Sequence, residues 1–153
     1  MTEGFTEIIA SWKNENTFLG QNTDGGTVQM GTFEGKPGFS PMQLLLVSLA
    51  GCTGMDIVSI LHKKHLKLDD MQVRVRGIRS TVYPKIWTDI HITYLIWGDN
   101  LHPRDVEQAI RLSEEKYCSV GLMLCKVSKI TSEYHLLEPG EIVNKGVWNE
   151  RTD

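Results

Sequence analysis

Residues 40–64 read SPMQLLLVSLAGCTGMDIVSILHKK, and this long apolar stretch decides the fold. Its opening carries three helix-start signals: Ser40 as a cap, Pro41 at the first helical position and Gln43 three residues after the cap. The stretch is long enough to raise the question of a membrane span. Between Met42 and Leu61 it also contains Asp56, three hydroxyl residues and two glycines, which favour a protein interior over lipid. We therefore predict a central buried helix over residues 40–64.

Composition places the chain among ordinary soluble proteins. It has 153 residues, of which 41% are apolar and 23% charged, and its net charge is −3. A chain of this size can form one domain with its own core. The weak acidic charge argues against nucleic acid or an anionic membrane surface as a partner. The first residues lack a signal-peptide pattern, and three cysteines suit a reducing cytoplasm, so we expect a cytoplasmic location.

The flanking sequence predicts strands around this helix, within a single domain over residues 1–153. Residues 1–35 are expected to form short strands, with a hairpin turn at Asp24-Gly25. Residues 70–137 are expected to form two strands, a helix and a further strand, in that order. Residues 138–153 are expected to be a loose tail. The fold class is therefore α+β. The helix is expected to start at His102-Pro103 and to present one face made of Val106, Ala109, Ile110 and Ser113.

The central helix needs cover on most of its surface, and one short chain supplies little of it. A second copy of the chain is the simplest source of that cover, so the sequence predicts a homodimer. Gly51 and Gly54 fit this prediction, because each costs roughly 1 kcal/mol relative to alanine inside a helix. A close approach by a helix or sheet, or room for a substrate, would justify that cost.

Two cysteines are the candidate chemical groups. Cys52 lies in the middle of the apolar helix, and Cys118 closes the later helix. They are either a nucleophile with a resolving partner or small core residues, which is what isolated apolar-helix cysteines usually are. Asp56 follows Cys52 by four residues and therefore shares its helix face. Asp56 is either a functional acid that modulates the thiol or a structural partner for a buried hydroxyl or cation.

Several segments together resemble the OsmC/Ohr family of organic hydroperoxide reductases. They are FEGKPGFSPMQLL at residues 33–45, AGCT at residues 50–53 and YCSV at residues 117–120. The resemblance implies an OsmC-like fold, in which two intertwined chains wrap antiparallel sheets around two long central helices. It also implies a thiol peroxidase, with Cys52 as the peroxidatic thiol and Cys118 as the resolving thiol.

The chemistry implied by the resemblance needs no cofactor. The Cys52 thiolate would reduce an organic hydroperoxide and become a sulfenic acid, which Cys118 would convert to a disulfide. An external dithiol would then reduce the disulfide, as part of an oxidative stress response. Cys125 is an alternative resolving thiol.

The sequence departs from the family where the thiol is activated. The family has an arginine before the Phe-Glu-Gly segment and a glutamate after the helix-opening proline. This chain has Thr32 and Met42 at those positions. Asp56 would disfavour the Cys52 thiolate. These features indicate a divergent branch, and an alternative function is a redox or small apolar ligand-binding protein with little peroxidase activity. A structural dimer with incidental cysteines is a third possibility.

Other patterns predict no metal and no cofactor. His62 and His65 lie one turn apart, but Lys63 and Lys64 between them indicate a solvated basic helix end, which suits the helix dipole. The sequence has no glycine-rich phosphate loop and no closely spaced cysteine cluster of the zinc-binding type.

Overall fold

The computed structural model describes residues 4–143, and the chain divides into two compact units, Met1–Leu45 and Leu46–Asp153. The first unit is made of strands. They are β1 (Ile8–Asn14), β2 (Thr17–Asn22), β3 (Thr27–Met30), β4 (Thr32–Phe33) and β5 (Lys36–Pro37).

The first three strands form an antiparallel sheet in the order β1-β2-β3, and β4 pairs with β5. The predicted turn at Asp24-Gly25 joins β2 to β3 and is confirmed. Gly25 has a φ of +91° there, which a glycine adopts without strain.

The predicted central helix is α1 (Pro41–Lys63), and its capping box is confirmed. The Gln43 backbone N–H donates to Ser40 Oγ at 3.1 Å, and the Ser40 N–H donates to Gln43 Oε1 at 2.9 Å. These bonds satisfy two donors that an uncapped helix would leave unpaired. The buried residues of α1 recur at every fourth position: Leu49, Thr53, Ile57 and Leu61.

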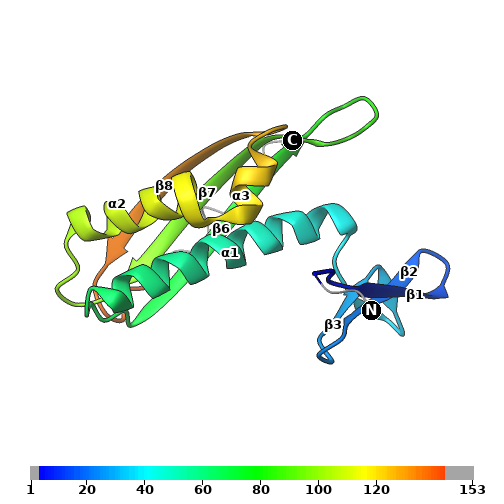
Figure 1. The fold of residues 1–153 in the computed structure, drawn as a ribbon, viewed down its shortest axis with the longest axis horizontal. Helices are drawn as coiled ribbons and strands as arrows, with labels where there is room; N and C mark the ends of the chain where they lie inside the picture. Colours follow the sequence, from blue (N-terminus) through cyan, green and yellow to red (C-terminus); the bar gives the residue numbers. More distant parts are fainter. Residues whose placement is uncertain (1–3, 144–153) are drawn as a thin grey trace. The chain divides into compact units, whose positions relative to one another are not determined.

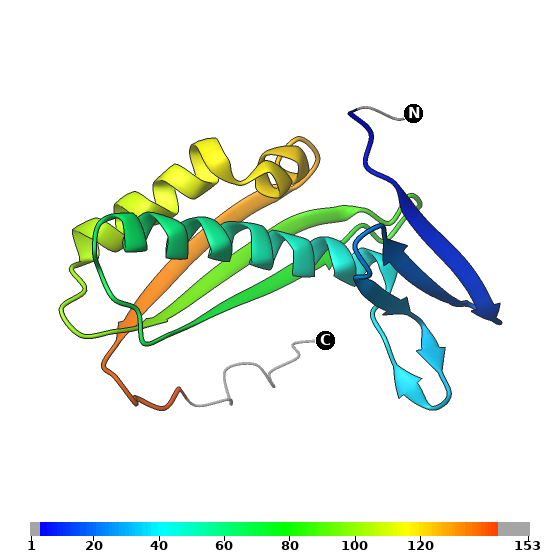
Figure 2. The ribbon, with the colours of Figure 1, turned by 60° about the horizontal axis from the view of Figure 1, so that its bottom comes forward.

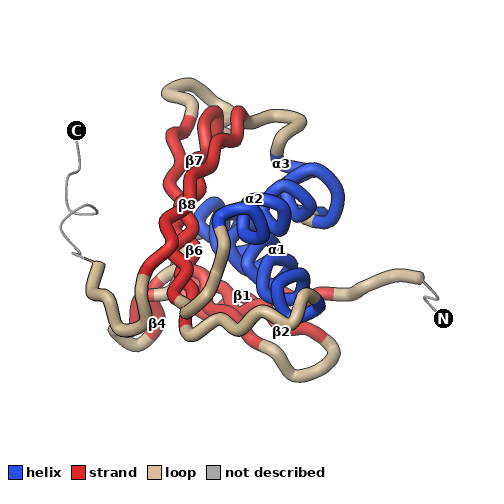
Figure 3. The backbone as a smooth tube through the Cα atoms, turned by 90° about the vertical axis from the view of Figure 1, so that its left-hand side faces the viewer, coloured by secondary structure: helices blue, strands red, loops and turns tan. Residues whose placement is uncertain are grey.

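The second unit places its helices on one face of a three-stranded sheet (Figure 3). Its strands are β6 (Asp70–Arg79), β7 (Trp87–Trp97) and β8 (Lys129–Leu137), in the order β6-β7-β8. Its helices after α1 are α2 (Pro103–Leu112), the π-helix η1 (Ser113–Tyr117) and α3 (Ser119–Leu124), which follow one another between β7 and β8 (Figure 1).

The predicted antiparallel arrangement holds for β6 and β7, but β8 runs parallel to β7. The reason lies in the connection. Because α2, η1 and α3 carry the chain back across the face of the sheet, β8 starts at the same end as β7 and takes the same direction. Figure 2 shows α1 lying along the sheet, and Figure 3 shows it beside α2 on the same face.

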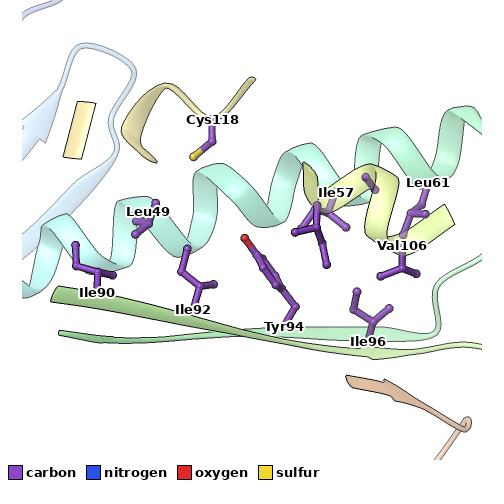
Figure 4. Packing of buried hydrophobic residues seen from close by; sticks show 11 residues of the cluster. Leu49, Ile57, Leu61, Ile90, Ile92, Tyr94, Ile96, Val106 and Cys118 are labelled. Atoms are coloured by element: carbon purple, nitrogen blue, oxygen red, sulfur yellow. The ribbon is translucent and has the colours of Figure 1, made fainter. Parts of the chain in front are cut away.

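The core of the second unit lies between β7 and the helices (Figure 4). Alternate β7 residues point into it, and they meet apolar residues of α1 and α2. Its most deeply buried members are Leu49, Ile57, Leu61, Ile90, Ile92, Tyr94, Ile96, Val106, Ala109 and Cys118. The predicted inner face of α2 is confirmed, including Ser113 one residue beyond its end.

The loose tail expected over residues 138–153 stays a prediction. Residues 138–143 contain no helix or strand, and residues 144–153 lie outside the described residues.

Candidate functional site

The structure brings together the three residues that the sequence singles out. Cys52 Sγ, a carboxylate oxygen of Asp56 and Cys118 Sγ all lie within 4.8 Å of one another. We call these three residues the thiol–carboxylate cluster. Cys52 and Asp56 are partly buried on adjacent turns of α1, and Cys118 is only 1% exposed. The expected shared face of Cys52 and Asp56 is therefore confirmed.

Cys118 is positioned by the junction between η1 and α3. Its backbone N–H donates to the carbonyl oxygen of Ser113 at 2.7 Å, the five-residue spacing of a π-turn. Its sulfur then caps α3, because Sγ accepts the Gly121 N–H at 3.3 Å. A Cβ at Gly121 would lie 3.2 Å from this sulfur, so the glycine leaves the space that the thiol occupies.

The surroundings of Cys118 favour its neutral thiol. Burial is the largest cause, and it raises the pKa of Cys118 to about 11, with further upward contributions from Cys52 and Asp56. The Gly121 N–H acts in the opposite direction, because a hydrogen bond to sulfur favours the thiolate. Two thiols and a carboxylate crowded together would all carry negative charge when ionised, and this repulsion adds to the upward shift of the Cys118 pKa that burial causes.

A buried row of three hydroxyl groups continues from Asp56 into the core. Ser113 Oγ donates to Asp56 Oδ2 at 2.9 Å and lies 2.9 Å from Thr53 Oγ1. Thr53 Oγ1 lies 2.9 Å from the Tyr94 hydroxyl, which donates to Glu114 Oε1 at 3.1 Å. We call Ser113, Thr53 and Tyr94 the hydroxyl chain. Its members are at most 1% exposed.

The hydroxyl chain has four contacts and three hydroxyl protons. Ser113 uses its hydroxyl proton to donate a hydrogen bond to Asp56, and Tyr94 uses its proton to donate one to Glu114. The single proton of Thr53 therefore serves only one of its two contacts. Burial raises the pKa of Tyr94 well above its ordinary value, so this phenol remains a donor at neutral pH. The chain fixes the orientation of the Asp56 carboxylate from the core side.

Replacing Thr53 with valine is expected to destabilise the protein by about 1–3 kcal/mol, because two buried hydroxyl groups lose a partner. The free energy of unfolding in urea, at equal protein concentration, measures this. Thr131→Val is the matched control: Thr131 is exposed on β8, so its substitution should stay within about 0.5 kcal/mol. Equal effects at both positions would contradict a structural role for the hydroxyl chain.

A small cavity of about 160 Å³ opens beside Cys118. Its lining combines the apolar Leu49, Ile92 and Ile130 with Thr53, Glu114, Gly121 and Cys125. Cys125 lies outside the thiol–carboxylate cluster: it is exposed, and its thiol donates to the carbonyl oxygen of Leu122 at 3.2 Å. The geometry therefore favours Cys118 over Cys125 as the partner of Cys52.

Sequence reasoning missed the hydroxyl chain and Glu114. Ser113 was assigned to the inner face of α2, but threonine, serine and tyrosine carry no motif that reveals a polar contact across the core. The one available signal was the spacing of Thr53 next to Cys52 and of Ser113 five residues before Cys118. His62 and His65 are both exposed and form no group with Cys, Asp or Glu within the described residues.

Comparison with known proteins gives consistent relatives. Residues 33–133 match the family model described as OsmC-like protein. The protein YhfA of Escherichia coli (strain K12) is 36% identical over 126 residues, which is 82% of this chain and 94% of YhfA. The crystal structure of a hypothetical protein from Aquifex aeolicus VF5 is 33% identical, with a TM-score of 0.79 over 88% of this chain and 97% of that chain.

A more distant structure shares the fold alone. The organic hydroperoxide resistance protein OhrB of Bacillus subtilis has a TM-score of 0.59 at 13% identity, over 88% of this chain and 100% of that chain.

Proposed function

This chain belongs to the OsmC-like family, and from that membership we propose that it reduces organic hydroperoxides through Cys52 and Cys118. The observation that carries the proposal is the proximity of the two sulfurs, which lie within 4.8 Å of each other. Their Sγ atoms come from segments 66 residues apart in the chain. A small side-chain movement would bring them to the bonding distance of a disulfide, about 2.05 Å.

The proposed reaction proceeds in two steps. The Cys52 thiolate attacks the distal oxygen of the hydroperoxide, the O–O bond breaks, and the alkoxide takes up a proton and leaves as an alcohol. The sulfenic acid on Cys52 is then attacked by the Cys118 thiolate, which forms the disulfide and releases water after protonation. An external dithiol restores both thiols by exchange and is itself oxidised to a disulfide.

The cavity beside Cys118 supports an apolar substrate. Leu49, Ile92 and Ile130 in its wall would accept a hydrocarbon group, and Thr53 and Glu114 in the same wall offer polar partners. The OhrB structure, which has the same fold, belongs to a protein described as giving resistance to organic hydroperoxides. Both observations favour an organic hydroperoxide over hydrogen peroxide.

A second function is favoured by the charges of the site. Asp56 stands beside both thiols, and among the described residues the ion pairs all lie elsewhere, so nothing cationic is seen to offset it. A site with these charges suits a redox or small apolar ligand-binding protein with little peroxidase activity. In that case the thiols would react slowly, and the cavity would hold a ligand.

We propose that this protein is cytoplasmic and forms a homodimer. Proteins of this family are typically homodimers. Helix α1 is long and apolar enough to span a membrane by length and composition, with a mean hydropathy of 2.0 over its most apolar window. Its buried residues belong to the core of the second unit, as expected of a partly buried core helix in a soluble protein. A second copy of the chain would cover the exposed apolar residues of α1.

Treatment of the reduced, metal-free protein with one equivalent of cumene hydroperoxide is expected to remove two free thiols per chain. Cys125→Ser should lose two thiols as well, whereas Cys118→Ser should lose one and keep a sulfenic acid on Cys52. Thiol titration and mass spectrometry of the linked peptides measure these outcomes. Unchanged thiols with a saturable change in Trp fluorescence on adding cumyl alcohol would support the ligand-binding function instead.

A further inference from the structure

The atoms of the thiol–carboxylate cluster are those that zinc prefers. Zinc binds thiolates at about 2.3 Å and carboxylates at about 2.0–2.2 Å, so two ligand atoms on one tetrahedral ion lie roughly 3.6–3.8 Å apart. Here two sulfurs and one carboxylate oxygen already lie within 4.8 Å of one another. Side-chain movements of about 1 Å would bring Cys52, Asp56 and Cys118 onto one ion.

The charge of the cluster also calls for a cation. Two thiolates and a carboxylate together carry three negative charges, and burying such charges without a partner is costly. Cys118 is fully buried, and Cys52 and Asp56 are partly buried. Within residues 4–143, none of the ion pairs involves this cluster. A divalent ion would offset most of the charge at its centre.

Hydrogen bonds from outside the cluster hold two of the three ligands. Ser113 Oγ donates to Asp56 Oδ2, and the hydroxyl chain holds Ser113 in turn. This contact leaves the other carboxylate oxygen available to an ion. The Gly121 N–H donates to Cys118 Sγ. Such outer contacts orient metal ligands in known sites, and losing one typically weakens binding about 10–100-fold.

We propose that Cys52, Asp56 and Cys118 bind one zinc ion per chain, with the fourth coordination position open to water. Thiolate ligands select zinc over magnesium and calcium, which prefer oxygen ligands. The site stands on its own geometry and does not depend on the proposed peroxide reduction.

Zinc and hydroperoxide would compete for the same sulfurs. Two zinc-bound thiolates and one hydroperoxide, taking two protons from water, would give one disulfide, one alcohol, one water molecule and a free zinc ion. The disulfide form therefore cannot keep the ion. The ion would shield the thiols from oxidation while it is bound.

The test is calorimetric titration of the reduced, chelator-treated protein with zinc chloride. One ion per chain is expected, and cobalt(II) should give the visible and near-ultraviolet bands of a tetrahedral thiolate site. Cys52→Ser, Cys118→Ser and Asp56→Asn should each weaken binding more than 100-fold, and Ser113→Ala about 10-fold. The matched controls are Cys125→Ser and Asp99→Asn, at exposed positions, and both should bind as the native chain does.

A second measurement avoids variants that fail to fold. In the native chain, zinc should protect Cys52 and Cys118 from alkylation and leave Cys125 reactive. The absence of saturable binding, or equal losses in the control variants, would overturn the zinc site. Disulfide formation without zinc binding would remove this inference alone. Zinc binding without any peroxide-driven disulfide would remove the proposed peroxidase function alone.

Discussion

Closure of the Cys52–Cys118 disulfide is expected to run about 100-fold faster at pH 9 than at pH 7 in the chelator-treated protein. The attacking species is the Cys118 thiolate, and burial raises the pKa of this thiol to about 11. Because the shift is upward, the thiol form dominates at neutral pH. The thiolate fraction then grows about tenfold with each pH unit until the pH approaches that pKa.

The same argument predicts that the sulfenic acid on Cys52 accumulates at pH 7, since its resolving partner is rarely ionised there. Rapid quenching with dimedone, followed by mass spectrometry, measures the sulfenic acid and the disulfide at each pH. Cys125→Ser should give the same profile. A rate that stays flat between pH 7 and pH 9 would contradict the expectation. It would indicate that a neighbouring base removes the Cys118 proton during the attack, and Asp56 is a candidate because one of its carboxylate oxygens lies within 4.8 Å of Cys118 Sγ.

The elements that the sequence predicts well are those with a local cause. The start of α1 follows from the capping box at Ser40 and Gln43, whose two hydrogen bonds involve residues only three apart. The turn at Asp24-Gly25 needs a left-handed backbone that glycine supplies. In both cases the residues that decide the structure are neighbours in the chain, so a pattern in the sequence reveals them.

The elements that the sequence does not predict depend on the tertiary fold. Helix α3 is not predicted from the sequence, because its cap is the sulfur of Cys118 and cysteine is not a usual capping residue. The π-turn that ends at Cys118 has no sequence signature. This turn places Ser113 in contact with Asp56 and Cys118 near Cys52. Packing against α1 therefore determines the conformation of the turn.

The candidate site follows the same division. The spacing of four residues predicts that Cys52 and Asp56 share a helix face, because helix geometry alone decides it. The sequence predicts no metal site, because zinc motifs are recognised by closely spaced ligands and Cys118 lies 66 residues after Cys52. The resemblance to the OsmC/Ohr family implies that Cys118 lies close to Cys52. The proximity of Cys118 to Asp56 appears only in the folded chain.

Met55→Glu is expected to convert the proposed dimer into a monomer at micromolar concentration. Met55 is 75% exposed on α1 and lines a groove of about 770 Å³ with Ala50, Gly51, Gly54 and Val58. Only 22% of the most apolar window of α1 is buried within one chain, so a partner chain would have to bury the rest of this apolar surface. A Cβ at Gly51 would meet nothing within 4 Å, which leaves room for a partner to approach closely.

The physical reason for the Met55→Glu effect is desolvation. A carboxylate at an apolar helix contact would lose its water, at a cost of several kcal/mol, counted once in each subunit of a symmetric dimer. Sedimentation velocity measures the change, and a lower melting temperature should accompany it. Met123→Glu is the control: Met123 lies on α3 and is 74% exposed, so the charge change and the initial exposure are matched. A native chain that sediments as a stable folded monomer would refute the dimer. Equal dissociation by both substitutions would show that the Met55 groove is not its specific interface.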